Sequence, residues 1–172
     1  VSAAPMEPRA AVGVFDTGED RYTLYCGVQN PHSMRRMLCS RILGIPETQL
    51  RVVSPDMGGA FGMRSNAYAE IALVLWSARR VGRPVKWTAD RSESFLADDQ
   101  ARHNRTTVEL ALDREGKFLA LRVRTLAALG AYLSMGGPTP AVMNLGSLAG
   151  VYTTPALHVS VRGVFMHTQS TS

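Results

Sequence analysis

The sequence predicts an α/β (α+β) fold in which a mixed sheet packs against helices. Three observations support this class. Short apolar runs alternate with polar turns, two segments carry apolar residues at helical spacing, and 45% of the residues are apolar while 19% are charged. A chain of 172 residues is long enough to build a core. We expect residues 1–172 to form a single partial domain.

Strands are predicted at residues 11–15, 21–28, 50–53, 85–89, 106–112, 118–128 and 158–166. Polar turns at residues 16–20 and 113–117 join neighbouring strands and predict two hairpins. Residues 130–150 are rich in Gly and Pro, so we expect mainly loop there, with a short helix near Ala141.

Two longer helices are predicted. The first covers residues 31–43, with Asn30 as its N-cap and Pro31 at its first position. The second covers residues 66–81 and is apolar over most of its circumference, which predicts burial on all sides. Glu70 lies within this helix, where a carboxylate needs a partner. We expect a backbone amide or an arginine to supply it, and a catalytic role is the alternative.

The most informative segment is the loop Asp56-Met57-Gly58-Gly59-Ala60-Phe61-Gly62, which joins the strand at residues 50–53 to the second helix. Glycines permit positive φ and remove the Cβ atoms that would block a ligand. Successive backbone N–H groups can then converge on a phosphate or an oxygen-rich cofactor, assisted by the N-terminus of the following helix. A sharp chain reversal without a ligand is the alternative interpretation.

The net charge of +5 is compatible with nucleic acid, but the arginines are dispersed, and no aromatic-interleaved patch accompanies them. An acidic cofactor or an acidic partner subunit fits this charge as well, so nucleic acid is the weaker alternative. No apolar run reaches the roughly 18 residues of a membrane span. The chain starts with neither a signal peptide nor a Met, and we expect it to begin inside a longer parent.

The cysteines and histidines do not suggest a metal site. Cys26 and Cys39 are isolated, so we expect them to be reduced, buried thiols of a cytoplasmic protein; a catalytic cysteine is the alternative. The four histidines are scattered, and no zinc-like cluster exists in the sequence.

Several short motifs follow one another along the whole chain. They are Ala4-Pro5-Met6-Glu7-Pro8-Arg9, Gln29-Asn30-Pro31-His32, Gly58-Gly59-Ala60-Phe61-Gly62, Gly82-Arg83-Pro84-Val85-Lys86-Trp87, Asp90-Arg91-Ser92-Glu93, Gly130-Ala131-Tyr132 and Gly150-Val151-Tyr152. In this order and spacing, the chain resembles the molybdenum-binding large subunit of the xanthine dehydrogenase, aldehyde oxidase and carbon monoxide dehydrogenase family. The resemblance implies that residues 1–172 are a fragment from the N-terminal part of the molybdopterin-binding region.

The resemblance also implies a cofactor and its contacts. The cofactor is molybdopterin, in bacteria usually the cytosine dinucleotide form, and the dithiolene of the pterin holds the metal, so no protein ligand to the metal is expected. Matched by position, the cofactor-binding residues are Gln29, Gly58, Gly59, Ala60, Phe61, Gly62 and Arg64. The amide of Gln29 resembles one that lies beside an oxo group, and the backbone amide of Phe61 resembles one that approaches the metal and pterin.

The same resemblance implies a small-molecule substrate, iron–sulfur clusters and FAD on partner subunits or domains, and an oligomer. Family members that act on purines carry a glutamate shortly after the Gly loop, whereas this chain has Met63-Arg64-Ser65. Aldehydes, aromatic heterocycles or another small molecule are therefore expected, and the cysteine-bearing loop needed for carbon monoxide is absent. The general base is expected beyond residue 172, so this fragment has no catalytic residue of its own and is expected to be inactive alone. A non-catalytic scaffold or assembly module of the same fold is the alternative.

Overall fold

The computed structural model describes residues 2–171, which form two compact units, residues 2–98 and residues 99–171. The first unit contains β1 (Ala10–Asp16), β2 (Arg21–Cys26), α1 (Pro31–Met37), a π-helix (Leu38–Leu43), a 3-10 turn (Glu47–Gln49), β3 (Leu50–Val53), α2 (Ala69–Val81), β4 (Val85–Thr88) and α3 (Arg91–Ala97). The second contains β5 (Asn104–Leu112), β6 (Phe118–Ala128), α4 (Thr139–Val142), a 3-10 turn (Leu145–Ser147) and β7 (Ala156–Val164). The predicted α/β class with mixed sheets is confirmed.

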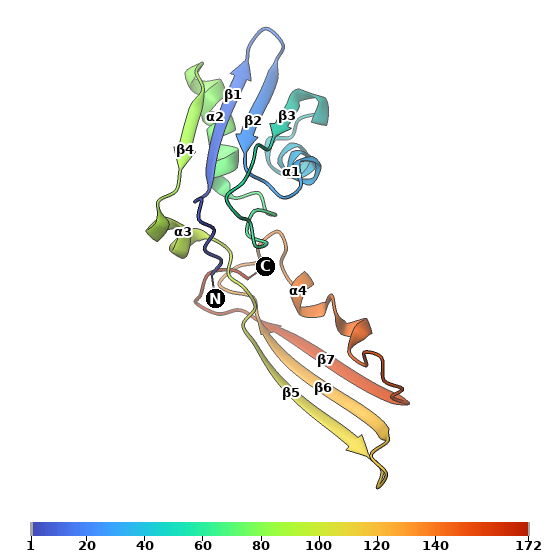
Figure 1. Cartoon of the computed structure of the whole chain (residues 1–172). Coiled ribbons are helices and arrows are strands. Elements are labelled where there is room, and N and C mark those ends of the chain that lie inside the picture. The colour runs from blue at the N-terminus through green and yellow to red at the C-terminus, as the bar shows by residue number, and fades with distance from the viewer. Residues whose placement is uncertain (1, 172) are drawn as a thin grey trace. The chain divides into compact units, whose positions relative to one another are not determined.

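The first unit is built on a four-stranded sheet in the order β3-β2-β1-β4 (Figure 1). β1 runs antiparallel to both β2 and β4, whereas β2 and β3 are parallel. The predicted hairpin across residues 16–20 is confirmed. α2 packs on this sheet through Ile71, Val74, Leu75 and Ala78, which recur at helical spacing and are buried.

Gly13 in the middle of β1 lets α2 lie unusually close to the sheet. A Cβ atom at this position would lie 2.5 Å from the carbonyl oxygen of Val74 and 2.8 Å from the backbone nitrogen of Leu75. Because the obstructing atoms are helix backbone, no side-chain rotation relieves the clash. The packing of helix on sheet therefore depends on a glycine here.

α2 differs from its prediction in two respects. It begins at Ala69 rather than at residue 66, because Tyr68 is extended (φ −73°, ψ 156°). It is also not buried on all sides: Leu73 and Trp76 are 55% and 53% exposed. The helix packs against the sheet through one face, and sequence hydropathy does not reveal whether another element covers the opposite face.

The first helix is confirmed in its caps and extent. Asn30 Oδ1 accepts a hydrogen bond of 2.9 Å from the backbone nitrogen of Ser33, with Pro31 at the first position. The helix continues beyond Met37 as a π-helix and ends at Gly44, which adopts φ +65°.

α3 was not predicted. Its N-cap Asp90 accepts a 2.7 Å hydrogen bond from the backbone nitrogen of Glu93. The Asp-x-x-Glu spacing is a capping pattern that was available in the sequence. The short length of the helix gave too little periodicity to support a prediction.

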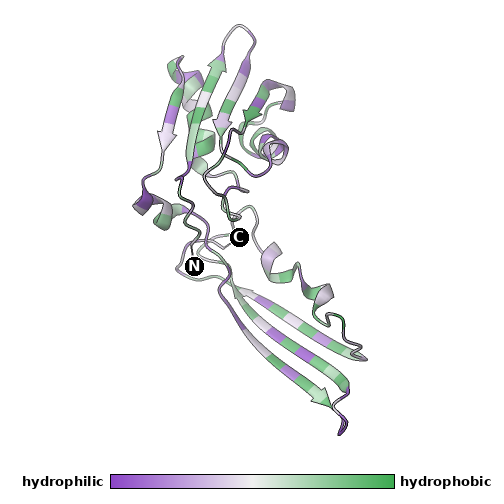
Figure 2. Cartoon of the chain, viewed as in Figure 1, coloured by the Kyte–Doolittle hydropathy of each residue, from purple (hydrophilic) through white to green (hydrophobic). Residues whose placement is uncertain are grey.

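The second unit is a three-stranded sheet in the order β5-β6-β7. β5 and β6 form the predicted antiparallel hairpin, with an irregularity at Ala111 and Leu112, and β7 lies parallel to β6. Hydrophobic and hydrophilic residues alternate along these strands (Figure 2), as expected for a sheet with one polar face. The predicted short helix in residues 130–150 is α4.

Both cysteines are free and buried, as predicted. Burial raises the pKa of the Cys26 thiol to about 11, although the nearby guanidinium groups of Arg64 and Arg9 oppose this shift.

No helix within residues 2–171 is long and apolar enough to cross a membrane.

Replacing Gly13 with Ala is expected to lower the free energy of unfolding by about 1–3 kcal/mol, because the added methyl group meets the α2 backbone. Chemical denaturation of the full-length protein measures this change. The matched control is G146A, since a Cβ atom at Gly146 meets nothing within 4 Å. Equal stability of the two variants would contradict the close approach of helix and sheet.

Cys26 is expected to react slowly with iodoacetamide in the native protein. With a pKa of about 11, the thiolate fraction rises roughly tenfold for each pH unit between pH 8 and pH 10 and does not level off there. Mass spectrometry of the modified Cys26 peptide, in a C39A background, follows the rate. A plateau below pH 9 would show that the thiol is not shielded as the structure indicates.

Candidate functional site

The loop between β3 and α2 has an unusual backbone. Gly59, Phe61 and Gly62 all have positive φ values, of +107°, +51° and +91°. Glycine adopts such angles readily, but a phenylalanine does so at a cost. The Phe61 side chain is 78% exposed, so burial of the ring does not repay this cost. A bulky residue in a strained conformation on an exposed loop is typical of functional sites.

Glu7 fastens the start of this loop. Its carboxylate accepts a 2.7 Å hydrogen bond from the backbone nitrogen of Gly58, and its own backbone nitrogen donates to the Gly58 carbonyl at 3.3 Å. A Cβ atom at Gly58 would lie 2.6 Å from the Glu7 Cβ. Gly58 is therefore required for the two chain segments to meet.

Arg64 fastens the other end of the loop. Its Nη2 donates to the Glu7 carbonyl at 2.7 Å, to the Glu7 carboxylate at 3.2 Å and to the Pro8 carbonyl at 3.2 Å. The side chain is buried, and its Nε atom has no hydrogen-bond partner among the described residues. The structure thus places this predicted cofactor-binding residue behind the loop, where it braces the backbone; a direct contact with cofactor stays a prediction.

Gln29 lies beside the end of the loop. Its backbone nitrogen donates to the Arg64 carbonyl at 3.2 Å, and its Oε1 accepts a 3.1 Å hydrogen bond from the Ser65 hydroxyl. The residue is exposed. With Oε1 engaged, the two protons on Nε2 are available to a ligand. The structure therefore brings Gln29 and the Gly loop together, although they lie far apart in the sequence.

The loop presents a row of available donors. Within residues 2–171, no hydrogen bond is recorded for the backbone nitrogens of Gly59, Ala60, Phe61 and Gly62. The Ala60 carbonyl accepts a hydrogen bond from the backbone nitrogen of Met63, and the Gly62 carbonyl accepts one from that of Ser65. These two bonds close tight turns directly after the row of donors. We expected the N-terminus of the following helix to lie directly behind the glycines and to assist ligand binding. This prediction is wrong, because α2 begins only at Ala69. The loop's own amides are the donors.

Arg9 is a buried residue near this site to which the sequence analysis gave no role. Its Nε lies 2.6 Å from Asp98 Oδ1, its Nη1 lies 3.2 Å from Glu70 Oε2, and its guanidinium lies 3.8 Å from the centre of the Tyr68 ring. Burial by itself lowers the pKa of Arg9, but Asp98 and Glu70 outweigh it and raise the pKa above its ordinary value. The prediction that an arginine partners Glu70 is confirmed.

The roles of Glu7, Ser65 and Arg9 were missed because each depends on a partner distant in sequence. Glu7 belongs to the Ala4–Arg9 motif. It lies 51 residues before Gly58, and a separation of this length does not predict that the two residues are in contact. In the described part of the chain, no group of three His, Cys, Asp or Glu side chains is placed to hold a metal ion.

The chain is similar to known proteins. Residues 1–172 match the family described as molybdopterin cofactor-binding domain. The chain is 34% identical over 164 residues to the 6-hydroxypseudooxynicotine dehydrogenase complex subunit gamma of Paenarthrobacter nicotinovorans, and this match covers 95% of the chain and 20% of that protein. It is 37% identical over 166 residues to the carbon monoxide dehydrogenase large chain of Hydrogenophaga pseudoflava, covering 96% of the chain and 20% of the relative.

A solved structure has a similar fold. The crystal structure of quinoline 2-oxidoreductase from Pseudomonas putida 86 superposes with a TM-score of 0.94 at 34% identity, over 99% of this chain and 22% of that chain. The chain spans about a fifth of the length of the curated relatives that it matches. On this evidence the chain belongs to the molybdopterin cofactor-binding domain family of molybdenum-containing oxidoreductases.

Proposed function

We propose that this chain forms one wall of the molybdopterin site in the large subunit of a molybdenum hydroxylase, and that the cofactor is the cytosine dinucleotide form. The full protein oxidises an aldehyde or an aromatic heterocycle with water as the oxygen source. The observation that carries this proposal is the row of available amides at residues 59–62 beside the exposed amide of Gln29.

The donor set fits the cofactor. The molybdenum of this cofactor would carry oxo oxygens and its nucleotide phosphate oxygens, and both kinds accept hydrogen bonds from neutral amides. A Cβ atom at Gly59 would lie 3.0 Å from Phe61 Cε2 and 3.2 Å from Pro5 Cβ, so a larger residue would disturb the loop that carries these amides. Residues 58–62 carry no carboxylate of their own, and the neighbouring Glu7 carboxylate is engaged by the Gly58 amide and by Arg64.

When bound, the molybdenum cofactor supplies the two-electron redox chemistry of the reaction. The chain's own part is to bind and orient it. Gln29 donates from Nε2 toward an oxygen of the cofactor, and the Ser65 hydroxyl fixes the amide by donating to Oε1. The contact between Glu7 and the buried side chain of Arg64 holds the loop amides in position before the cofactor arrives.

Several features favour a heterocyclic or aldehyde substrate. Ser65 stands where purine-oxidising members carry a glutamate, and it is engaged with Gln29. Two similar proteins, quinoline 2-oxidoreductase and the nicotine 6-hydroxylase large subunit of Paenarthrobacter nicotinovorans, are named for aromatic heterocycles.

The rest of the catalytic machinery lies on other segments. We place the general base elsewhere in the large subunit, and the iron–sulfur clusters and FAD on partner subunits or domains of a cytoplasmic oligomer. Relatives named as a subunit gamma, a large chain and a large subunit support a multi-subunit assembly. The fragment alone is expected to be inactive.

The first test is cofactor content. Full-length protein made in a host that supplies the cytosine dinucleotide cofactor is expected to contain equimolar molybdenum, measured by mass spectrometry, and equimolar cytidine nucleotide after acid hydrolysis. G59A is expected to lose most of both, because of the positive φ and the contacts with Phe61 and Pro5, whereas G146A retains them. Wild-type protein without molybdenum or cytidine nucleotide would overturn the proposal.

The second test separates the enzyme from a non-catalytic scaffold. Gln29→Ala is expected to lower kcat by about 100-fold while molybdenum content is retained, because one oriented donor is lost. Ser65→Ala is expected to lower kcat by roughly tenfold, since the Gln29 amide loses its orienting partner. Gln49→Ala is the matched control, because the one hydrogen bond recorded for the Gln49 side chain among the described residues goes to the exposed Asp20. Unchanged turnover in Gln29→Ala would favour the scaffold.

A further inference from the structure

One face of the three-stranded sheet is rich in arginine. The strand register aligns three rows of side chains across β5, β6 and β7, and alternation places all of them on the same face. The rows are Arg105–Leu126–Arg162, Thr107–Arg124–Ser160 and Glu109–Arg122–His158. We call these nine residues the arginine face. Every one of them is exposed.

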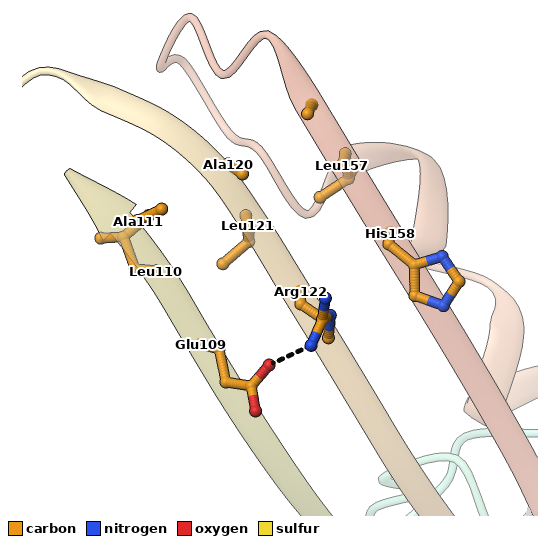
Figure 3. A pocket seen from close by; sticks show the side chains of 9 residues that line it. Glu109, Leu110, Ala111, Ala120, Leu121, Arg122, Leu157 and His158 are labelled. Carbon is orange, nitrogen blue, oxygen red and sulfur yellow. Dashed lines mark hydrogen bonds and ion pairs between the residues drawn. The ribbon is translucent and has the colours of Figure 1, made fainter. Parts of the chain in front are cut away.

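Two shallow hollows run over this face. One, of about 420 Å³, is lined by Arg105, Arg124 and Arg162 together with the hydroxyls of Thr107 and Ser160. The other, of about 380 Å³, is lined by Glu109, Arg122 and His158, which Figure 3 shows on the three neighbouring strands, together with six alanine and leucine residues. The face therefore offers several hydrogen-bond donors at strand spacing.

The positive charge of the face is not balanced within the described residues. Glu109 is its one carboxylate and is shared between Arg122 at 3.0 Å and Arg124 at 2.8 Å. No ion pair is recorded for Arg105 or Arg162 within residues 2–171. These two lie on either side of β6, at about 10 Å given the ordinary strand spacing, which is close to the screening length at physiological salt. Repulsion between two exposed charges at this distance is largely screened by salt, and both guanidinium groups are available to an anionic partner.

We propose that the arginine face docks an acidic surface of another polypeptide chain. A guanidinium group pairs with carboxylates through two parallel hydrogen bonds, and the neighbouring Thr107 and Ser160 hydroxyls add donors in the same row. Apart from the imidazole of His158, no residue lining the two hollows is aromatic, so the face lacks the stacking platform of single-stranded nucleic-acid sites. Charge and shape together favour a flat, acidic protein partner.

The test is binding of fluorescein-labelled poly-glutamate to the full-length protein at low salt, followed by fluorescence anisotropy. Wild-type protein is expected to bind, and added salt is expected to weaken the affinity steeply. R105Q/R162Q is expected to weaken binding at least tenfold. E109Q is expected to strengthen it several-fold, because Arg122 and Arg124 are released from their carboxylate.

A control pair of substitutions distinguishes binding at the arginine face from a general effect of the protein's positive charge. R41Q/R83Q removes the same number of charges from exposed positions outside the second unit, and it is expected to change the affinity less than twofold. Equal weakening by the two double variants, or no binding by wild-type protein, would overturn the proposal. Tighter binding of a single-stranded RNA of equal charge than of poly-glutamate would assign the face to nucleic acid and would overturn it too.

Discussion

The guanidinium group of Arg9 is the contact on which the first unit most depends. It is 4% exposed and bonds Glu70 of α2 and Asp98 after α3. Its guanidinium also lies over the Tyr68 ring and 5.1 Å from the centre of the Trp87 ring of β4. A buried charge is tolerated only when it is paired, so these groups must assemble together. One side chain thus links the segment before β1 to α2, β4 and α3.

The same N-terminal segment holds the Gly loop. Glu7 bonds Gly58 at the start of the loop and Arg64 at its end, while Arg91 of α3 donates to the carbonyls of Pro5 and Met6. Positive φ at a phenylalanine is costly, and these contacts on both sides of Phe61 offset the strain. The available amides are therefore fixed before a ligand binds, which reduces the entropy that binding would otherwise lose.

The two sheets are used in different ways. The four-stranded sheet buries one face under α2 and serves as a scaffold from whose β3 end the Gly loop extends. The three-stranded sheet has Val108, Leu110, Leu121 and Val123 on one face and the arginine face on the other. Exposed leucine and valine side chains on the first of these faces, such as Val108 and Leu110, leave apolar surface open in the second unit.

Local patterns of apolar spacing, Pro, Asn and Gly were enough to predict most of the strands, the caps of α1 and the position of the Gly loop. The sequence also determined, through ordered motifs, the family to which the chain belongs. It did not reveal that Glu7 clamps Gly58, that Ser65 holds Gln29, or that four arginines share one sheet face. Those facts depend on strand register and on contacts between residues tens of positions apart. Only tertiary structure decides them, because long-range packing, not local propensity, selects which side chains meet.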